Sequence, residues 1–130
     1  MASPSRPLAD QELAIMTIVW EGGATTVREV YETLRQRRPV AYTTVMTMMN
    51  ILEQKGFLER EREGRAFVYR PTRSQRRVVR QMVREFVERV FGGSARPLLV
   101  HLVEDRKLTP EDLREIARLL ERKKKEEEEG

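Results

Sequence analysis

The segment from Ala41 to Gly56 constrains the fold more than any other stretch, because it predicts a helix with two contrasting faces. No proline or glycine interrupts it before Gly56, which stands where a helix C-terminal glycine belongs. Apolar residues at positions i, i+3, i+4 and i+7 form one face, namely Val45, Met48, Met49 and Leu52. The opposite face has no charge and carries Thr43, Met46, Thr47, Asn50 and Gln54.

The uncharged outer face indicates what this helix contacts. Exposed helix faces are normally filled with Glu, Lys and Arg, and charged residues make up 35% of this chain. Thr hydroxyls and an Asn amide can hydrogen-bond to base edges, and Thr and Met methyl groups can contact a thymine methyl. The helix is therefore a candidate for reading bases in a DNA major groove. The alternative is a helix that docks on another protein without sequence-specific DNA binding.

Two further helices are predicted before this one. Asp10 opens the first, with acidic residues in its first turn, and Gly22-Gly23 ends it. The run Thr26-Val27-Arg28-Glu29 has the form of a capping box and opens the second helix. That helix ends at Arg38-Pro39, because the residue before a proline is pushed out of the helical conformation.

A β-hairpin is predicted after Gly56. Residues 57–62 and 66–70 flank Glu63-Gly64-Arg65, whose glycine can adopt the positive φ of a tight turn. Three helices followed by a two-stranded hairpin is the order of a winged helix-turn-helix domain, in which the third helix reads DNA. We therefore expect a mainly α-helical protein that begins with such a domain.

Basic side chains mark where this domain would contact phosphate. The candidates on the hairpin, or wing, are Arg60, Arg62 and Arg65, and weaker candidates on the second helix are Arg28 and Tyr31. An alternative exists for the wing, because Glu59, Glu61 and Glu63 alternate with the arginines. The whole strand could then be a solvated face with cross-strand ion pairs.

The second half of the chain predicts three amphipathic helices, the last opened by the cap Thr109-Pro110. Three short helices are too few to bury their own apolar stripes, so we expect a second copy of the chain to cover them in a two-fold dimer. The alternative is that they fold back on the first domain. The predicted dimerisation residues are Val79, Met82, Val83, Phe86, Val90, Leu99, Leu102, Leu113, Ile116 and Leu120.

These patterns divide the chain into a DNA-binding domain over residues 8–72 and a helical dimerisation domain over residues 73–125. Residues 1–7 contain two prolines and two serines, and residues 126–130 end a run of lysines and glutamates. We expect both ends to be disordered.

Several function classes are excluded by composition. The 130 residues contain no cysteine and one histidine, so we expect no metal site and no cofactor. No Ser/His/Asp set, phosphate-binding glycine loop or paired carboxylates point to an enzyme. No apolar run approaches the roughly 20 residues of a membrane span, and no signal core is present, so a cytoplasmic protein is expected. The net charge of +4 is too small to indicate DNA binding by itself.

With these motifs placed, the chain resembles the penicillinase-repressor (BlaI/MecI) family of bacterial winged-helix regulators over about residues 8–122. The resemblance is carried by seven runs of residues in a fixed order. They are Leu8 to Met16 followed by Val19-Trp20, Thr26 to Val30, Ala41 to Thr47, Leu52 to Leu58, Phe67-Val68-Tyr69, Leu99 to Glu104, and Leu108 to Leu113.

This resemblance implies a homodimeric repressor that binds inverted-repeat operators of β-lactam resistance or similar stress genes. The base-reading positions of the family fall on Thr43, Thr44, Met46 and Thr47. The family also implies a membrane sensor that leads to proteolysis in the dimerisation region. His101-Leu102 stands where staphylococcal-type repressors have an Asn-Phe cleavage pair, and we expect His101 to be a partly buried structural residue. Copper-responsive relatives carry a cysteine cluster, which this chain lacks.

Overall fold

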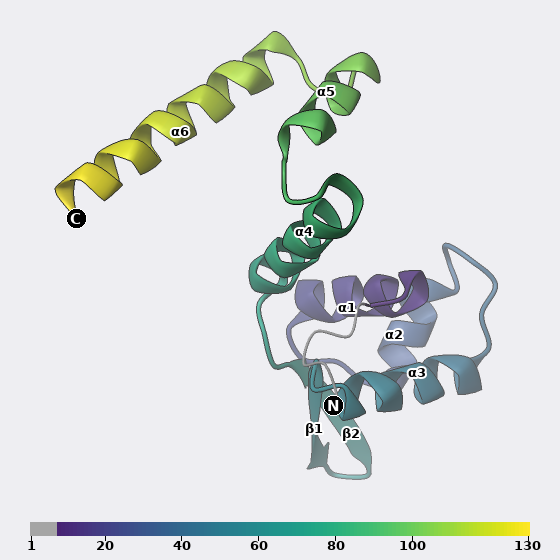
Figure 1. The fold of residues 1–130 in the computed structure, drawn as a ribbon. Coiled ribbons are helices and arrows are strands. Elements are labelled where there is room, and N and C mark those ends of the chain that lie inside the picture. Colours follow the sequence, from purple (N-terminus) through teal and green to yellow (C-terminus); the bar gives the residue numbers. More distant parts are fainter. Residues whose placement is uncertain (1–7) are drawn as a thin grey trace. The chain divides into compact units, whose positions relative to one another are not determined.

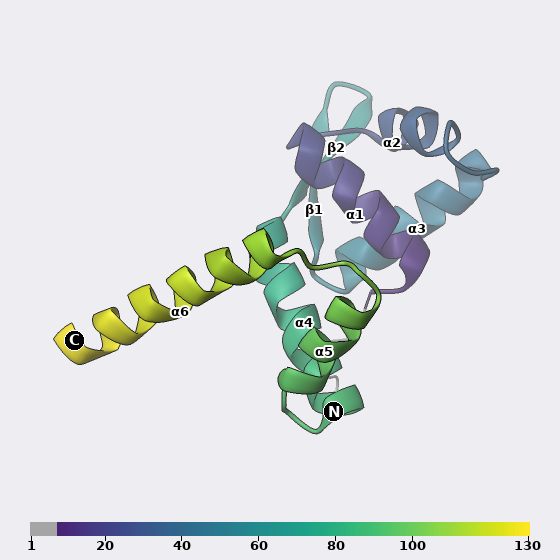
Figure 2. The same cartoon turned by 90° about the horizontal axis from the view of Figure 1, so that it is seen from above.

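The computed structural model describes residues 8–130, so the predicted disorder of residues 1–7 lies outside the described residues. The chain forms three helices, a two-stranded hairpin and three more helices (Figures 1 and 2), which confirms the predicted fold class. The elements are α1 (Asp10–Gly22), α2 (Val27–Leu34), α3 (Tyr42–Gln54), β1 (Leu58–Glu63), β2 (Ala66–Pro71), α4 (Gln75–Phe91), α5 (Arg96–Glu104) and α6 (Pro110–Glu129).

The chain divides into two compact units, one ending at Met82 and one beginning at Val83. The predicted boundary between residues 72 and 73 falls earlier than this division. The reason is that the start of α4 packs on the first unit, where Val78 is buried and Met82 contacts the core. The Trp20 indole also donates a hydrogen bond to the Arg73 carbonyl oxygen, 2.9 Å away, which fixes the segment before α4.

The core of the first unit lies between α1, α2, α3 and the hairpin. Its fully enclosed side chains come from every one of these elements: Ile15, Met16, Val19, Val30, Val45, Met49, Leu52, Leu58 and Tyr69. The predicted apolar face of α3 is therefore buried, with Met48 half-buried at its edge. Gly56 follows this helix at φ 87°, a backbone conformation that favours glycine.

The capping box predicted at the start of α2 is present. The Thr26 hydroxyl accepts a hydrogen bond from the Glu29 amide at 3.1 Å, and the Glu29 carboxylate accepts one from the Thr26 amide at 2.9 Å. Both bonds satisfy amide groups that the first helical turn leaves without a partner. The sequence signal therefore located the beginning of α2 to the residue.

The hairpin is antiparallel, and its last pair, Glu63 opposite Ala66, flanks a turn in which Gly64 has φ 64°. A second pairing holds β2 from its other edge. Thr25 and Tyr69 exchange two backbone hydrogen bonds of 3.0 Å and 2.7 Å, which tie β2 to the loop between α1 and α2. The wing is thereby anchored on both edges at Tyr69.

A buried ion pair joins the beginning of α1 to the end of α3. Lys55 Nζ lies 2.9 Å and 3.1 Å from the two carboxylate oxygens of Glu12, and the side chains are 14% and 6% exposed. One oxygen of Glu12 also accepts from the Ala9 amide at 2.9 Å. The charge of Glu12 is thus neutralised inside the fold, where an unpaired carboxylate would be costly.

The second unit differs from the first in having no core of its own. The structure describes α5 and α6 in full, and neither contains a buried residue. The predicted cap of α6 is confirmed, since Thr109 accepts a hydrogen bond from the Asp112 amide at 3.0 Å. The helix continues to Glu129, although we expected residues 126–130 to be disordered. Lysine and glutamate are good helix formers, and Lys123 pairs with Glu126 at 3.9 Å.

Replacement of Lys55 by methionine should destabilise the first unit by about 3 kcal/mol, because the Glu12 carboxylate loses its buried counter-charge. Urea unfolding followed by circular dichroism measures this change. The double variant Lys55→Met/Glu12→Gln is the control, since the amide oxygen of glutamine can still accept from Ala9 without a charge. It should recover more than half of the loss. Equal stability of Lys55→Met and the wild type would show that this pair does not hold α1 to α3.

Candidate nucleic-acid interface

The outer face of α3 is exposed and uncharged, as the sequence predicts. The side chains of Thr43, Thr44, Met46 and Thr47 all face solvent. Glu53, near the end of the helix, is paired with Arg60 at 3.4 Å. The structure therefore brings four of the five predicted base-reading residues together on one open helix face.

Asn50, the fifth predicted base-reading residue, has a different environment. It is half-buried, and its side-chain oxygen accepts a hydrogen bond from the Tyr69 hydroxyl at 3.2 Å. Tyr69 lies on the wing, nineteen positions further along the chain. No pattern in the sequence links these two residues, because the contact depends on how the hairpin packs against α3.

The wing has two faces of different charge. Side chains alternate across a strand, and the register places Arg60 opposite Tyr69 and Arg62 opposite Phe67, so these four share one face. The guanidinium groups of Arg60 and Arg62 lie 4.3 Å and 5.7 Å from the centre of the Phe67 ring. Both arginines are thus held on the face that also carries Tyr69.

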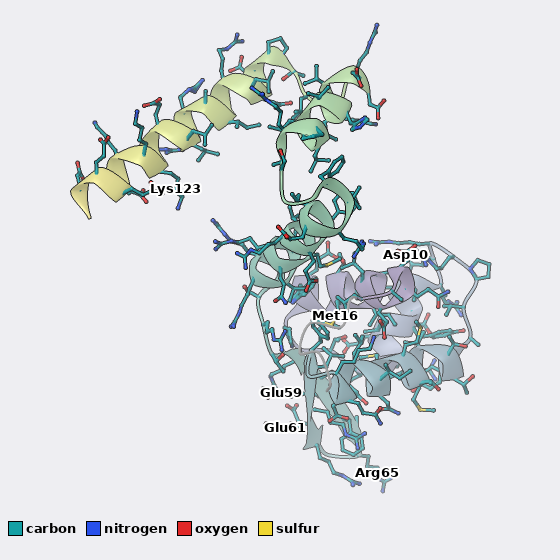
Figure 3. The ribbon with its side chains drawn as sticks, viewed as in Figure 1. Asp10, Met16, Glu59, Glu61, Arg65 and Lys123 are labelled. Atoms are coloured by element: carbon teal, nitrogen blue, oxygen red, sulfur yellow. The ribbon has the colours of Figure 1, made fainter. Side chains whose placement is uncertain are left out.

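The glutamates occupy the other face of the wing. Arg70 lies 3.9 Å from Glu61 and 3.3 Å from Glu63, so cross-strand ion pairs do form, as the alternative interpretation proposed. They involve Arg70, however, and leave Arg62 and Arg65 free of carboxylates. Glu59 and Glu61 project on the side of the hairpin away from α3, and Arg65 stands at its free end (Figure 3).

A cleft of about 450 Å³ lies between the wing, the beginning of α2 and α3. Three of the predicted phosphate-contacting arginines line it, Arg28, Arg60 and Arg65, and no acidic residue of the described chain does. The remaining lining residues are Thr26, Val27, Tyr42, Met46, Asn50, Ala66, Phe67 and Tyr69. Glu32 and Glu53, which do not line the cleft, pair with Arg28 and Arg60 at 3.4 Å each, and Arg65 has no carboxylate partner. The lining is therefore basic and contains aromatic rings.

Aromatic contacts position the basic residues of α2 beside α3. The Arg28 guanidinium lies 5.3 Å from the centre of the Tyr42 ring, and Tyr31 packs edge-on against Tyr42 with 5.5 Å between ring centres. The hydrogen bond that Arg35 donates to the Tyr31 hydroxyl oxygen, together with the nearby carboxylate of Glu32, raises the pKa of Arg35 above its ordinary value. Arg35 was not predicted as a site residue, because no sequence motif marks it.

The predicted dimerisation residues divide between the two units. Met82 contacts the core of the first unit, so it is not part of an open stripe. Leu102 and Ile116 are half-buried, whereas the exposed members of the set are Val79, Val83, Phe86, Val90, Leu99, Leu113 and Leu120. The His101 side chain is 66% exposed, which corrects our expectation of partial burial within the single chain.

Among residues 8–130, no helix is long and apolar enough to cross a membrane. The same residues contain no cluster of histidine, aspartate and glutamate that could hold a metal ion. What the described chain does offer is an open helix face beside a wing with an arginine-lined cleft. Three helices and this wing define a winged-helix protein.

Comparison with known proteins identifies the family. A family model described as "Penicillinase repressor" matches residues 8–122. The chain is 27% identical over 117 residues to the penicillinase repressor of Bacillus licheniformis, covering 90% of this chain and 91% of that protein. It is 38% identical over 99 residues to the transcriptional regulator BlaI of Mycobacterium tuberculosis, covering 75% of this chain and 72% of that protein.

A solved structure agrees with the family assignment. The DNA-binding domain of the repressor BlaI superposes with a TM-score of 0.51 at 31% identity, covering 58% of this chain and 90% of that domain. The chain belongs to the penicillinase repressor family of winged-helix, DNA-binding transcriptional repressors. It is thus a regulator and not an enzyme.

Proposed function

We propose that the protein is a homodimeric repressor that binds inverted-repeat operator DNA and blocks transcription of the adjacent gene. The observation that carries the proposal is the open, uncharged face of α3 beside an arginine-lined cleft. A major groove accepts one helix, and the exposed side chains of Thr43, Thr44, Met46 and Thr47 have the hydrogen-bonding and methyl groups that base edges match. The burial of Val45, Met49 and Leu52 holds this face outward.

Phosphate contacts come from the wing and from α2. Arg65 is exposed at the wing tip and makes no ion pair or ring contact within the described chain, so its charge is available to a phosphate. Arg62 adds a second charge near the tip, bonded only to the Gly64 carbonyl oxygen and stacked near Phe67. Arg28 and Tyr31 on α2 supply further phosphate contacts in this proposal.

The exposed apolar side chains of the second unit support dimerisation. This unit presents a series of large apolar side chains to solvent, with Val90 51% and Leu120 66% exposed, and neither α5 nor α6 buries any residue. Isolated helices of this length gain their stability from packing an apolar face. A second copy supplies that packing, and the two-fold axis of the dimer places two α3 helices on the two halves of an inverted repeat.

The regulated genes and the route of induction are proposed from the family. Bacillus licheniformis has a relative named penicillinase repressor, which supports control of β-lactam resistance or similar stress genes. Induction would follow proteolysis at His101-Leu102, started by a membrane sensor protease. This bond lies inside α5, so the helix must open before a protease can bind it.

Selection from a random library of DNA duplexes, followed by titration of the enriched duplex and a shuffled control at two salt concentrations, tests the proposed function. We expect the enriched duplex to contain an inverted repeat and to bind about a thousandfold more tightly than the control. Affinity should fall steeply with salt because bound phosphates release counterions. If no sequence is enriched and no salt-dependent binding occurs, α3 docks on a protein and the proposal is wrong.

Replacement of Thr47 by alanine should weaken binding to the selected duplex by about 1–3 kcal/mol and relax the preference at one base pair in each half-site. The physical reason is the loss of a hydroxyl that bonds a base edge. Affinity for the shuffled duplex should not change. An equal loss on both duplexes would count against Thr47 as a base-reading residue.

Replacement of Arg65 by alanine should weaken binding to the selected and shuffled duplexes alike and reduce the salt slope by about one unit. The charge at the wing tip contacts phosphate groups, which are the same for every base sequence. Glu61→Ala is the matched control on the opposite face of the same hairpin and should leave the salt slope unchanged. A selective loss on the selected duplex would assign Arg65 to base reading instead.

Replacement of Val90 by arginine should convert the dimer to a monomer, because the apolar stripe would then have to bury a charge. Light scattering gives the mass, and Glu88→Arg is the control at a neighbouring exposed position on α4. The Val90 variant should also lose affinity for the inverted repeat, since the two half-sites no longer bind together. A dimeric Val90→Arg protein would exclude this stripe from the interface.

A further inference from the structure

The Tyr69 hydroxyl is among the most firmly positioned polar groups of the first unit. The residue is 2% exposed and its backbone is paired on both edges of β2, with Arg60 on one side and Thr25 on the other. The hydroxyl reaches from the wing across to α3 and donates to the side-chain oxygen of Asn50 at 3.2 Å. A buried residue of the core thereby sets the orientation of one amide at the surface.

This hydrogen bond changes what Asn50 can do. An asparagine that reads adenine uses both ends of its amide, accepting from N6 and donating to N7. Here the oxygen is already engaged by Tyr69, and the amide nitrogen has no partner within residues 8–130. Asn50 therefore presents the cleft with two N–H donors. Such a group binds hydrogen-bond acceptors. It matches poorly the major-groove edge of adenine, which presents one donor and one acceptor.

The surroundings of Asn50 indicate which acceptor its amide nitrogen binds. It lines the cleft of about 450 Å³ together with Arg28, Arg60 and Arg65, and no acidic residue of the described chain is part of the lining. Arg28 and Arg60 are paired with Glu32 and Glu53 from outside the cleft, whereas Arg65 has no carboxylate partner. Tyr42 and Phe67 form apolar walls beside these charges. A cleft lined by three guanidinium groups with an N–H donor attracts an anion, and a DNA phosphate oxygen is the anionic acceptor that the duplex supplies.

We propose that Asn50 contacts a DNA phosphate rather than a base, and that Tyr69 acts as the positioning residue that aims its amide nitrogen into the arginine-lined cleft. This inference rests on the proposed function and assigns Asn50 a role different from the one expected from its place on α3. The pair links the wing to the third helix, so a change on one element alters the DNA contact made by the other. The two residues should behave as a single unit in binding.

A double-mutant cycle with Asn50→Ala, Tyr69→Phe and the combined variant tests the proposal, using the selected and shuffled duplexes described above. We expect Asn50→Ala to weaken binding to both duplexes by about tenfold and Tyr69→Phe by about three- to tenfold. In the Asn50→Ala background, Tyr69→Phe should have no further effect. Asn50→Asp should bind both duplexes more weakly than Asn50→Ala, since a carboxylate there repels phosphate.

Thr72→Val is the matched control for Tyr69→Phe. It removes a hydroxyl that donates to the Gly56 carbonyl oxygen, in the same unit and outside the residues that line the cleft. It should leave DNA affinity unchanged, and thermal melting should show that each variant folds. Equal losses of DNA affinity for Thr72→Val and Tyr69→Phe would mean that Tyr69 acts only through stability, and would overturn its positioning role.

Two further outcomes would overturn the inference. A repeat of the library selection with Asn50→Ala that changes the preferred base at one position would assign Asn50 to base reading. Additive losses in the double-mutant cycle would show that the Tyr69 hydroxyl does not act through Asn50. If the wild-type protein itself enriches no sequence and shows no salt-dependent binding, the proposed function fails, and this inference fails with it.

Discussion

The burial of one face of α3 is the constraint on which the rest of the structure depends. Val45, Met49 and Leu52 are completely enclosed by α1, α2 and the hairpin, so the helix cannot rotate about its axis without exposing them. Burying three such side chains contributes about 1.5–3 kcal/mol each, which far exceeds what the threonines opposite could gain by entering the core. The threonine face therefore points outward because the opposite, apolar face of α3 is buried.

The hairpin shows how a short, strongly charged segment can serve two purposes. Tyr69 and Leu58 belong to the core, and Tyr69 is bonded to the loop before α2, so the wing is fixed at its base. Toward the tip the strand alternation separates the arginines from the glutamates, and Arg70 forms ion pairs with two of the carboxylates. The arginine face remains beside α3, and a chain of modest net charge acquires a locally basic surface.

The second unit forms helices within a single chain but buries no core there. Its last helix, α6, begins with a complete capping box, yet α5 and α6 bury no residue. Good local signals make helices form, but only packing of their apolar faces gives lasting stability. In the dimer that we propose, a partner copy supplies that packing, and association and DNA recognition then depend on one another.

The sequence by itself determined the local structure. The capping box at Thr26, the cap at Thr109, the glycines after α1 and α3, the turn at Gly64 and the two faces of α3 were all predicted, because each depends on residues within one or two helical turns. Only the tertiary structure decided which distant residues meet. The Tyr69–Asn50 hydrogen bond, the Glu12–Lys55 pair and the place of Met82 in the first core join segments whose approach is set by packing. No local spacing encodes such contacts, since they follow from how a complete set of apolar surfaces fits together.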